Sequence, residues 1–361
     1  MADCLCADTS APDNLNTEEY LCLWHKKYLR RITPVLNRVE KKMSDELLKV
    51  VVRKREQQTN DVIALELVDP QGKPLPVFEA GAHIDLHIGD GLVRQYSLCS
   101  DPADCSAYRL GILKDPASRG GSIAIHEGLQ EGSEIMISAP RNLFPLAENS
   151  GHSILIGGGI GITPMIAMAC ALHSAGRPFD LWYCGRSRST CAFLDDLAAS
   201  EFSAQVHTWF DDEQDGQRLD LDSVMADVAA DTHVYVCGPT GFMEWVISTA
   251  ADKGFADDNI HREFFQVDVE TGGDSFEVVA QASGITVQVG EQQTIAEALA
   301  EAGVRVKVSC EQGTCGTCLC DVLEGIPDHR DVFLTDDEKE DNDQILICCS
   351  RAKTPRLVLD I

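Results

Sequence analysis

Positive charge is scarce in this sequence, because 30 Lys and Arg stand against 58 Asp and Glu in 361 residues, for a net charge of −28. Nucleic acid and anionic membrane surfaces are therefore unfavourable partners. Proline is also scarce, with 14 residues, and the hydrophobic fraction of 44% is typical of a globular protein rather than a disordered or fibrous one. The length favours two or three domains.

An unbroken apolar run that could span a membrane is also missing. The uncharged stretch 149–176 is interrupted at its centre by glycines and by Pro164, so we interpret it as a strand, a glycine turn and a helix. The first residues lack the charged start and apolar run of a secretory signal, and we expect a cytoplasmic protein whose 15 cysteines are reduced. The hydrolase motifs HExxH and GxSxG are absent.

Six short β-rich runs follow one another in the first half of the chain, which predicts an antiparallel barrel. These runs are residues 47–54, 61–68, 82–88, 92–98, 108–113 and 133–138. After Gly151 strands alternate with helices, which predicts a parallel sheet covered on both faces. The helices are expected at residues 164–174, 193–199, 221–228 and 242–251. In the first of them Thr163 is the predicted N-cap and Pro164 the first helical residue.

The last 85 residues predict a small α+β unit. A hairpin of 276–281 and 285–289 precedes a helix at 294–302, which Thr294 and Glu297 are expected to open as a capping box. A further strand is expected at 304–309. Residues 1–42 contain a helical pattern at 17–42 but no visible chemistry, and we treat them as an extension of unknown role. The domains that we expect are 1–42, 43–148, 149–270 and 274–361, with residues 271–273 as a linker.

Four cysteines carry the most specific motif. The spacing Cys310-x4-Cys315-x2-Cys318 is followed after 29 residues by Cys348. Four thiolates in this spacing are typical of the plant-type 2Fe-2S site. A zinc site would present two separated CxxC pairs, and a disulfide requires an oxidising compartment, so both fit less well. We predict that these four cysteines are metal ligands.

Two glycines and two further cysteines border this set. Gly313 and Gly316 allow tight turns that aim backbone N–H groups at the sulfur atoms. Cys349 adjoins Cys348 and Cys320 follows Cys318, but the 29-residue gap favours Cys348 over Cys349 as the fourth ligand. We interpret Cys320 and Cys349 as structural.

A second motif, ILIGGGIGITP, joins a strand, a glycine turn and the start of a helix. Such a turn brings backbone amides and a helix N-terminus against a pyrophosphate. The motif departs from GxGxxG because Pro164 stands where the third glycine would be, and alone it fits an ordinary tight turn equally well. The candidate nucleotide-binding residues are Gly157, Gly158, Gly159, Gly161, Thr163 and Pro164.

A third motif lies on a barrel strand and on the loop that follows about 25 residues later. An arginine fork and a Gly-Gly-Ser helix start can grip one phosphate from two sides, and a tyrosine can cover a flat ring. Alone the motif fits an ordinary strand and a glycine turn as well. Its residues are Arg94, Gln95, Tyr96, Ser97 and Leu98, and then Arg119, Gly120, Gly121 and Ser122.

Together, and in this order, the three motifs resemble the ferredoxin-NADP reductase superfamily, specifically the phthalate dioxygenase reductase family, which includes vanillate demethylase reductase. The resemblance covers residues 47–361. It implies a six-stranded antiparallel flavin-binding β-barrel, an α/β parallel-sheet nucleotide-binding domain and a C-terminal α+β domain of the β-grasp type with a 2Fe-2S cluster.

The resemblance also implies roles for single residues. Arg94, Tyr96 and Ser97 would bind FMN, with Ser97 near the reactive flavin nitrogen and Arg94 and Ser122 at the phosphate. The run 157–164 would bind the pyrophosphate of the nucleotide. The element Cys237-Gly238-Pro239 would lie beside the nicotinamide, and His261, Glu263 and Phe265 match an HxExF ending whose aromatic ring covers the flavin. The residues assigned to catalysis are Ser97, Cys237, Glu263 and Phe265. Core packing is the alternative role for Cys237 and Phe265.

The implied activity is electron transfer. A nicotinamide gives up two electrons as hydride and a 2Fe-2S cluster accepts one, so a flavin must stand between them. A plant-type cluster at roughly −400 mV lies below a Rieske centre at about −150 mV or higher, so delivery to a terminal Rieske oxygenase is downhill. The family's usual substrates are aromatic acids such as phthalate or vanillate. Alternatives are a cytochrome or quinone acceptor, and a redox-sensing binding protein.

The resemblance points to NADH as the electron donor. The loop Arg186-Ser187-Arg188-Ser189 follows a predicted strand where the ribose 2' position would be recognised. Arginine and serine there can accept a 2'-phosphate, so this loop leaves NADPH open.

Overall fold

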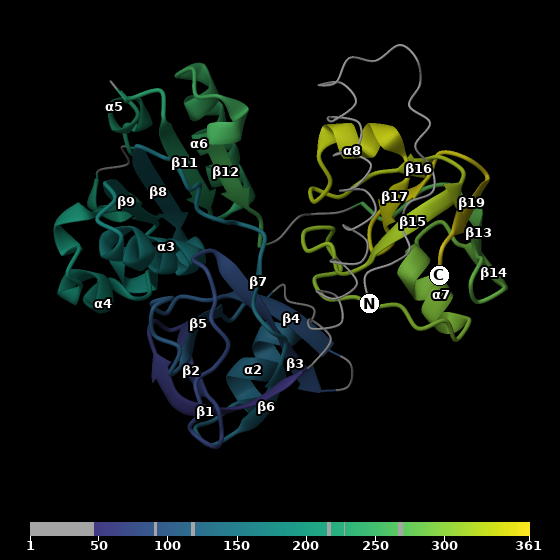
Figure 1. The fold of residues 1–361 in the computed structure, drawn as a ribbon, viewed down its shortest axis with the longest axis horizontal. Helices are drawn as coiled ribbons and strands as arrows, with labels where there is room; N and C mark the ends of the chain where they lie inside the picture. Colours follow the sequence, from purple (N-terminus) through teal and green to yellow (C-terminus); the bar gives the residue numbers. More distant parts are fainter. Residues whose placement is uncertain (1–46, 90–91, 117–119, 215–217, 227, 266–269) are drawn as a thin grey trace, which may run out of the picture. The chain divides into compact units, whose positions relative to one another are not determined.

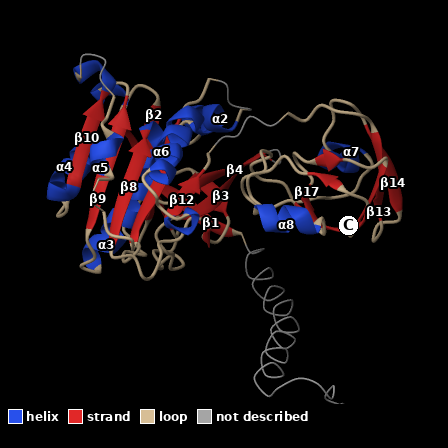
Figure 2. Cartoon of the chain, turned by 90° about the horizontal axis from the view of Figure 1, so that it is seen from above, coloured by secondary structure: helices blue, strands red, loops and turns tan. Residues whose placement is uncertain are grey.

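The computed structural model describes residues 47–89, 92–116, 120–214, 218–226, 228–265 and 270–361. The expected extension 1–42 with its helical pattern, and the candidate phosphate ligand Arg119, lie outside these ranges. The described part contains three main sheets. Figure 1 colours them along the sequence, and Figure 2 shows their strands in red from above. None of its helices is long and apolar enough to cross a membrane.

The first sheet is a nearly closed antiparallel barrel. Its strands run in the order β4-β3-β6-β1-β2-β5, with β7 paired to β3, and a bridge between Leu98 and Leu110 links the end of β4 to β5. All six strands that the β-rich runs predict are present. The elements are β1 (Leu48–Gln57), β2 (Val62–Val68), β3 (Ala82–Gly89), β4 (Leu92–Ser97), β5 (Tyr108–Leu113), α2 (Gly121–Gly128), β6 (Glu134–Ile137) and β7 (Arg141–Asn142).

The second sheet is parallel, with strand order β10-β9-β8-β11-β12. The chain therefore runs outward from β8 to β10, returns to the other side of β8 at β11, and creates a switch point between β8 and β11. Ligands of open α/β sheets bind at such a point, outside the carboxyl ends of the strands. The elements are β8 (His152–Gly158), α3 (Ile162–Ser174), β9 (Phe179–Gly185), α4 (Leu194–Ala199), β10 (Val206–Phe210), α5 (Leu221–Val224), β11 (Thr232–Cys237), α6 (Thr240–Asp252) and β12 (Ile260–Glu263).

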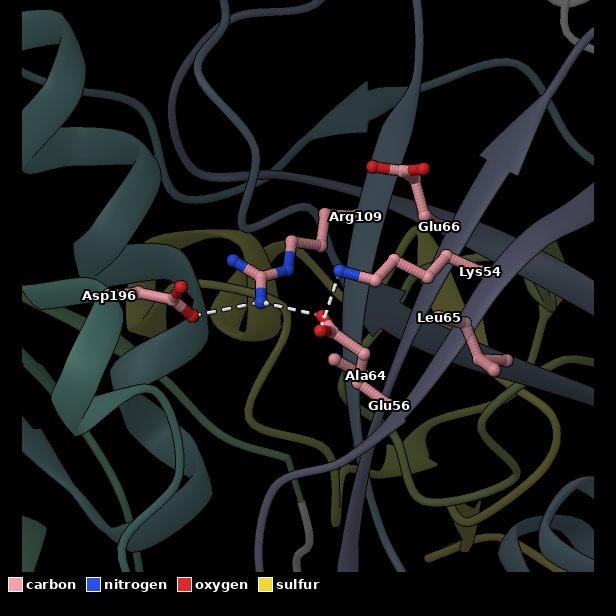
Figure 3. Close-up of a pocket in the computed structure, with 7 residues that line it drawn as sticks. All are labelled: Lys54, Glu56, Ala64, Leu65, Glu66, Arg109 and Asp196. Carbon is pink, nitrogen blue, oxygen red and sulfur yellow. Dashed lines mark hydrogen bonds and ion pairs between the residues drawn. The ribbon is translucent and has the colours of Figure 1, made fainter.

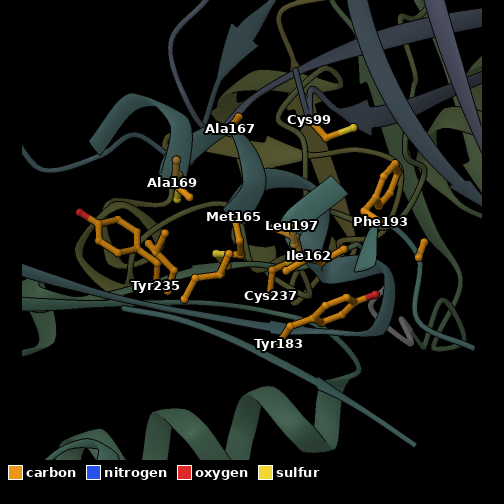
Figure 4. Packing of buried hydrophobic residues seen from close by; sticks show 14 of the residues in the cluster. Cys99, Ile162, Met165, Ala167, Ala169, Tyr183, Phe193, Leu197, Tyr235 and Cys237 are labelled. Atoms are coloured by element: carbon orange, nitrogen blue, oxygen red, sulfur yellow. The ribbon is translucent and has the colours of Figure 1, made fainter. Parts of the chain in front are cut away.

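Two hydrophobic clusters cover the two faces of this sheet. On one face α3 buries Ile162, Met165 and Met168 in a cluster that also contains Cys99 and Phe144 from the barrel side. Figure 4 shows part of this cluster, including Ile162, Met165 and Cys99. On the other face the cluster contains side chains of α5 and α6, such as Leu221, Met243 and Val246. The predicted sheet with helices on both faces is confirmed.

The start of α3 differs from the prediction. A 3-10 turn at Gly159–Gly161 runs directly into the helix, and Gly161 rather than Thr163 is the N-cap. Thr163 lies inside the helix, where its Oγ1 donates to the carbonyl of Ile160 at 3.1 Å. Pro164 is the third helical residue, where its missing N–H costs nothing because the first four helical N–H groups have no partner within the helix.

The helix predicted at 221–228 is also shorter than expected. Asp220 caps it through a hydrogen bond from the backbone N–H of Ser223 at 3.1 Å, but helical geometry ends at Val224. Met225, with φ −104°, leaves the helix and is buried in the same cluster as Leu221.

An arginine joins the barrel to the nucleotide-binding sheet. Arg109 of β5 places Nη2 2.8 Å from Oδ2 of Asp196 in α4 and 3.5 Å from Oε2 of Glu56 in β1 (Figure 3). Its guanidinium also lies 5.0 Å from the ring centre of Phe193. Two carboxylates thus face one guanidinium, and the polar hollow around Arg109 is lined by more acidic than basic side chains: Glu56, Glu66 and Asp196 against Arg109 and Lys54.

The third sheet has the order β14-β13-β19-β15-β17, beside a short pair β16-β18. The predicted hairpin is present, and Thr294 and Glu297 form the predicted capping box. The elements are β13 (Phe276–Ala280), β14 (Ile285–Val289), α7 (Ile295–Glu301), β15 (Leu319–Glu324), β16 (Pro327–Asp328), α8 (Asp336–Asp341), β17 (Gln344–Leu346), β18 (Arg351–Ala352) and β19 (Arg356–Leu359).

The strand predicted at 304–309 is absent from this sheet. Val304, Val306 and Val308 still point toward the core, so the alternation of apolar and polar side chains reflects real packing. The segment has no ladder partner in the described part, however, and passes as irregular chain into the cysteine loop. Alternation therefore predicted burial correctly and strand pairing wrongly.

Candidate redox site

Glycines let two loops meet at the switch point of the parallel sheet. An ideal Cβ on Gly161 would lie 2.2 Å from the carbonyl oxygen of Cys237, and one on Gly158 would lie 2.9 Å from the ring of Phe242. Gly238 faces the same ring and would bring a Cβ within 3.1 Å of Cα of Gly158. The two predicted nucleotide-binding motifs therefore lie against each other at the carboxyl ends of β8 and β11.

The remaining glycines of the turn have different surroundings. Gly157 pairs with Cys237 across the sheet and leaves 3.0 Å between an ideal Cβ and Cα of Ile162. Gly159 has φ +55°, which side chains disfavour, and nothing lies within 4 Å of its Cβ position. Thr163 is buried in α3, and Pro239 is the N-cap of α6. The turn thus leaves open space at Gly159.

The barrel motif lies along β4 and the start of α2. An ideal Cβ on Gly121 would be 2.5 Å from Cγ of Arg94, so the arginine side chain lies directly over the N-terminus of α2. Gly120, the N-cap, has φ +91°, and the Oγ of Ser122 accepts a hydrogen bond from the N–H of Asp115 at 3.1 Å. The arginine and the helix start that sequence reasoning grouped together are neighbours in space.

The other residues of β4 differ in their environment. Gln95 pairs with Asp85 in the ladder, and Tyr96 is half-buried against the barrel core. Burial raises the pKa of the Tyr96 phenol above its ordinary range. Leu98 is fully buried and belongs to the barrel core. The polar groups of β4 nearest the parallel sheet are therefore those of Ser97.

A hydrogen bond connects the barrel to the last strand of the parallel sheet. Ser97 donates from Oγ to Oε2 of Glu263 at 3.0 Å, and Glu263 is the ladder partner of Cys237. Burial raises the pKa of Glu263 to about 8, against the lowering effect of the Ser97 hydrogen bond. Burial and the nearby Glu263 raise the pKa of the fully buried Cys237 thiol. Three of the four residues assigned to catalysis are thus contiguous.

Two members of the HxExF ending have packing partners within the protein. A hydrogen bond of 2.8 Å joins Nε2 of His261 to Nδ1 of His233, and the tautomers decide which nitrogen donates. The His261 ring also stacks on Tyr235, with ring centres 4.4 Å apart. Burial and His233 lower its pKa to about 4, so His261 is neutral at neutral pH. Phe265 is half-buried against the cluster that contains α3.

The four cysteines of the third motif are buried and arranged in two pairs. The Cys315 thiol is within hydrogen-bond reach of Cys310, which together with burial raises the pKa of Cys315. Cys318 is similarly paired with Cys348, which raises the pKa of Cys318. In the described part no three His, Cys, Asp or Glu side chains converge on a single metal position. Two pairs fit a binuclear cluster with four thiolate ligands.

The loop around these cysteines depends on left-handed backbone conformations. Gly313 and Gly316 have φ +71° and +67°, and Cβ atoms there would be 2.6 Å from Sγ of Cys349 and 2.3 Å from the ring of Phe333. Backbone N–H groups of Gln312 and Thr317 point to Sγ of Cys310 and Cys315, both at 3.4 Å. Such N–H groups stabilise thiolates.

The two neighbouring cysteines have other contacts. Cys349 is buried, with Sγ 3.7 Å from the carbonyl oxygen of Leu346 and 3.8 Å from Oγ of Ser350. The Sγ of Cys320 lies 3.5 Å from the carbonyl oxygen of Asp321. These backbone contacts are consistent with structural roles.

Sequence reasoning missed an aspartate beside the cysteine loop. Asp85 of β3 is buried and accepts hydrogen bonds from Nη2 of Arg141 at 2.8 and 2.9 Å and from Oγ of Ser309 at 3.0 Å. Ser309 directly precedes Cys310, and Glu311 on its other side lies 3.9 Å from Arg94. The only sequence signal was a charged residue inside an apolar strand.

Comparison with known proteins agrees with this architecture. Residues 155–247 match the oxidoreductase NAD-binding domain family, and residues 278–353 match the 2Fe-2S iron-sulfur cluster binding domain family. The chain is 48% identical over 317 residues to vanillate O-demethylase oxidoreductase of Pseudomonas sp. strain HR199, covering 87% of this chain and all of that protein.

Solved structures give the same result. Phthalate dioxygenase reductase, described as a modular structure for electron transfer from pyridine nucleotides to [2Fe-2S], aligns with a TM-score of 0.71 and 38% identity, covering 88% of this chain and 98% of that chain. An intact type IV self-sufficient cytochrome P450 monooxygenase aligns with a TM-score of 0.76 and 39% identity over 87% of this chain and 41% of that chain.

The fold and sites therefore define an NAD(P)H-dependent oxidoreductase with flavin-binding and 2Fe-2S modules. Within this class the chain belongs to the oxygenase reductase family of vanillate O-demethylase oxidoreductase and phthalate dioxygenase reductase.

The close approach at the switch point predicts a strong effect of one methyl group. Gly161→Ala places a Cβ against the Cys237 carbonyl, so we expect a loss of about 1–3 kcal/mol in unfolding free energy and a raised KM for the nucleotide. Thermal unfolding and steady-state kinetics measure both. Gly241→Ala in α6 is the matched control, because nothing lies within 4 Å of its Cβ position. Equal effects of the two substitutions would contradict the steric explanation.

The half-buried carboxyl of Glu263 predicts a pH dependence of stability. Its folded-state pKa of about 8 lies above the ordinary value of 4.5, so the folded state holds a proton that the unfolded state releases. Its contribution is therefore most favourable below about pH 4.5 and is lost as pH rises toward 8. Glu263→Gln should flatten the decline of melting temperature across this interval. An unchanged slope in the variant would show that Glu263 is already ionised in the folded protein.

The cysteine pairs predict different results for two adjacent residues. Cys348→Ser should remove the native visible and EPR spectrum of the cluster, because Cys348 pairs with Cys318. Cys349→Ser should retain that spectrum, because Cys349 contacts backbone and Ser350 instead. Spectra of the two purified variants, with iron and sulfide contents, distinguish them. The opposite pattern would identify Cys349 as the fourth ligand.

Proposed function

We propose that this protein is the reductase component of a two-component Rieske non-haem iron oxygenase. It takes electrons from NADH and passes them through FMN and a 2Fe-2S cluster to a separate terminal oxygenase, whose substrate is an aromatic acid of the vanillate or phthalate type. The observation that carries the proposal is the similarity to vanillate O-demethylase oxidoreductase over that protein's whole length. We also propose the domain bounds 43–148, 149–270 and 274–361.

The barrel has a candidate binding site for a flavin with one phosphate. Arg94 lies over the start of α2, so a phosphate there would meet a guanidinium and the N–H groups of a helix N-terminus. This pairing supports FMN. Gln95, Tyr96 and Ser97 would hold the ring system from β4, and Gly120, Gly121 and Ser122 would hold the phosphate together with Arg94. Leu98, which is buried in the barrel core, would support this strand from beneath. A bound flavin would accept a hydride from the nicotinamide and release electrons one at a time.

Ser97 and Glu263 would orient the reacting rings. The Ser97 hydroxyl donates to Glu263, and this hydrogen bond fixes its position beside the place where the flavin would lie. Burial raises the pKa of Glu263 to about 8, which favours the neutral acid, so it would add little negative charge beside the rings. Cys237 with Gly238 and Pro239 would position the nicotinamide at the end of β11, and Phe265 would cover the flavin ring. These residues position the rings and need transfer no proton.

The pyrophosphate of the nucleotide would lie on the turn 157–164. Gly159 leaves open space beside the start of α3, where backbone N–H groups and the helix dipole favour negative charge. Arg186 is exposed after β9, at the carboxyl edge of the sheet where the adenosine ribose would lie.

The metal ligands would be Cys310, Cys315, Cys318 and Cys348. Their sulfur atoms are buried, paired two by two and approached by backbone N–H groups, which suits a cluster that exchanges single electrons. Ser309 connects this loop to Asp85 of the barrel, and Glu311 lies near Arg94. These contacts connect the loop that would hold the cluster to the barrel that would hold the flavin.

A cytochrome acceptor is the second candidate function. The similarity to part of a self-sufficient cytochrome P450 monooxygenase supports it, because that chain combines a homologous region with a P450. Under this alternative the nucleotide, flavin and cluster sites are the same and only the acceptor differs.

Reconstitution tests the proposed acceptor. Purified holoprotein should contain FMN, iron and sulfide, reduce cytochrome c with NADH, and support vanillate turnover by the terminal oxygenase of a vanillate demethylase. Turnover with a bacterial cytochrome P450 in place of the oxygenase would favour the second candidate. Absence of NADH-driven reduction of either partner and of cytochrome c would contradict both candidates.

A further inference from the structure

The loop after β9 lies beside the carboxyl end of β10, because Gly185 and Phe210 are ladder partners in the parallel sheet. The backbone N–H of Asp212 also donates to the carbonyl of Arg186 at 3.1 Å, which connects the two strand ends. The residue after the second strand of such a sheet recognises the ribose 2' position of the nucleotide. Side chains from both strand ends are therefore available for this recognition.

Arg188 of this loop is held by a carboxylate from the neighbouring strand end. Its Nε lies 2.9 Å from Oε1 of Glu213 and its Nη2 lies 3.2 Å from Oε2, which is a two-pronged contact. The guanidinium also lies 4.5 Å from the ring centre of Phe210. The hydrogen bond with Glu213 raises the pKa of Arg188, so the arginine remains charged. Its Nε and Nη2 donors, however, are already bonded to the Glu213 carboxylate.

The hydroxyl groups of the loop are also engaged. Ser187 accepts a hydrogen bond from the N–H of Ser189 at 3.3 Å, and the two Oγ atoms lie 2.9 Å apart. From the sequence alone, both arginines and both serines of the loop 186–189 could bind a 2'-phosphate. In the folded protein one arginine and both serines already have protein partners.

These contacts change the balance between the two nucleotides. A 2'-phosphate must displace Glu213 from Arg188 and must approach the carboxylates of Asp211, Asp212 and Glu213 at the end of β10. A 2'-hydroxyl carries no charge and can donate a hydrogen bond to a carboxylate oxygen. The side chains of Arg188 and Glu213 are 56% and 42% exposed, so the pair is accessible to a nucleotide and screened by solvent.

We propose that Glu213 is a specificity-determining residue, which restrains Arg188 and so favours NADH over NADPH. The inference rests on the proposed function, in which this edge of the sheet binds the pyridine nucleotide. It assigns the preference to a contact between two strand ends rather than to the residue types of the loop after β9. Because the pair is exposed, the discrimination is moderate.

Steady-state reduction of ferricyanide by the holoprotein, with NADH and with NADPH, tests this role. Glu213→Gln should raise kcat/KM for NADPH about tenfold through a lower KM, with kcat unchanged and NADH kinetics within about twofold. Adding Arg188→Ala to this variant should cancel the gain, because the released arginine is what binds the 2'-phosphate. Inhibition by 2'-AMP should follow the same pattern as the KM for NADPH.

Asp212→Asn is the matched control, since it removes one negative charge next to Glu213 but no side-chain hydrogen bond with Arg188. It should change kcat/KM for NADPH far less than Glu213→Gln. The inference is overturned if both substitutions act equally, if Arg188→Ala leaves the gain intact, or if the unmodified protein prefers NADPH. Failure of both nucleotides to reduce ferricyanide would instead contradict the proposed function, so the two failures are distinguishable.

Discussion

The contact between Gly161 and the carbonyl of Cys237 is the constraint on which the rest of the nucleotide-binding region depends. It brings the turn after β8 and the loop after β11 together, and only a residue without a side chain permits that distance. The contact fixes the start of α3 and the position of Cys237. Through the ladder between β11 and β12 it also fixes Glu263, which meets Ser97 of the barrel. A steric requirement at one glycine thus propagates to the contact between two sheets.

The polar side chains where β12 meets the barrel have hydrogen-bond partners. Glu263 is half-buried with Ser97 as its hydrogen-bond donor, and the raised pKa means that the neutral acid is the form that folding favours. His261 is likewise kept neutral by burial beside His233 and Tyr235. The contact around Ser97 and Glu263 therefore carries little charge, in contrast to the ion pairs of Arg109 elsewhere between barrel and sheet. The acidic residues lie mostly at the surface, where water solvates them.

The sequence predicted features that depend on local chemistry. The six barrel strands, the parallel sheet and the capping box at Thr294 follow from periodicity and from side chains three residues apart. Thr163 was assigned wrongly as a cap because a 3-10 turn precedes the helix, and residues 304–309 lack a ladder partner in the described part. Contacts such as Asp85 with Ser309, or Arg188 with Glu213, join residues far apart in sequence, so no local pattern could reveal them.

Buried Arg351 provides another contact between distant residues, because it binds the backbone of residues 271–273. The sequence suggests that residues 271–273 are a linker, because two of them are glycines. Arg351 is 2% exposed, however, and donates to the carbonyls of Thr271, Gly273 and Asp274 as well as to those of Gln293 and Gly290. Five carbonyl oxygens satisfy a cation that has no carboxylate bonded to it among the described residues, and releasing the segment would leave buried donors unpaired. Residues 271–273 are therefore held in place by hydrogen bonds to Arg351, and a Cβ on Gly273 would lie 2.9 Å from Nε of this arginine.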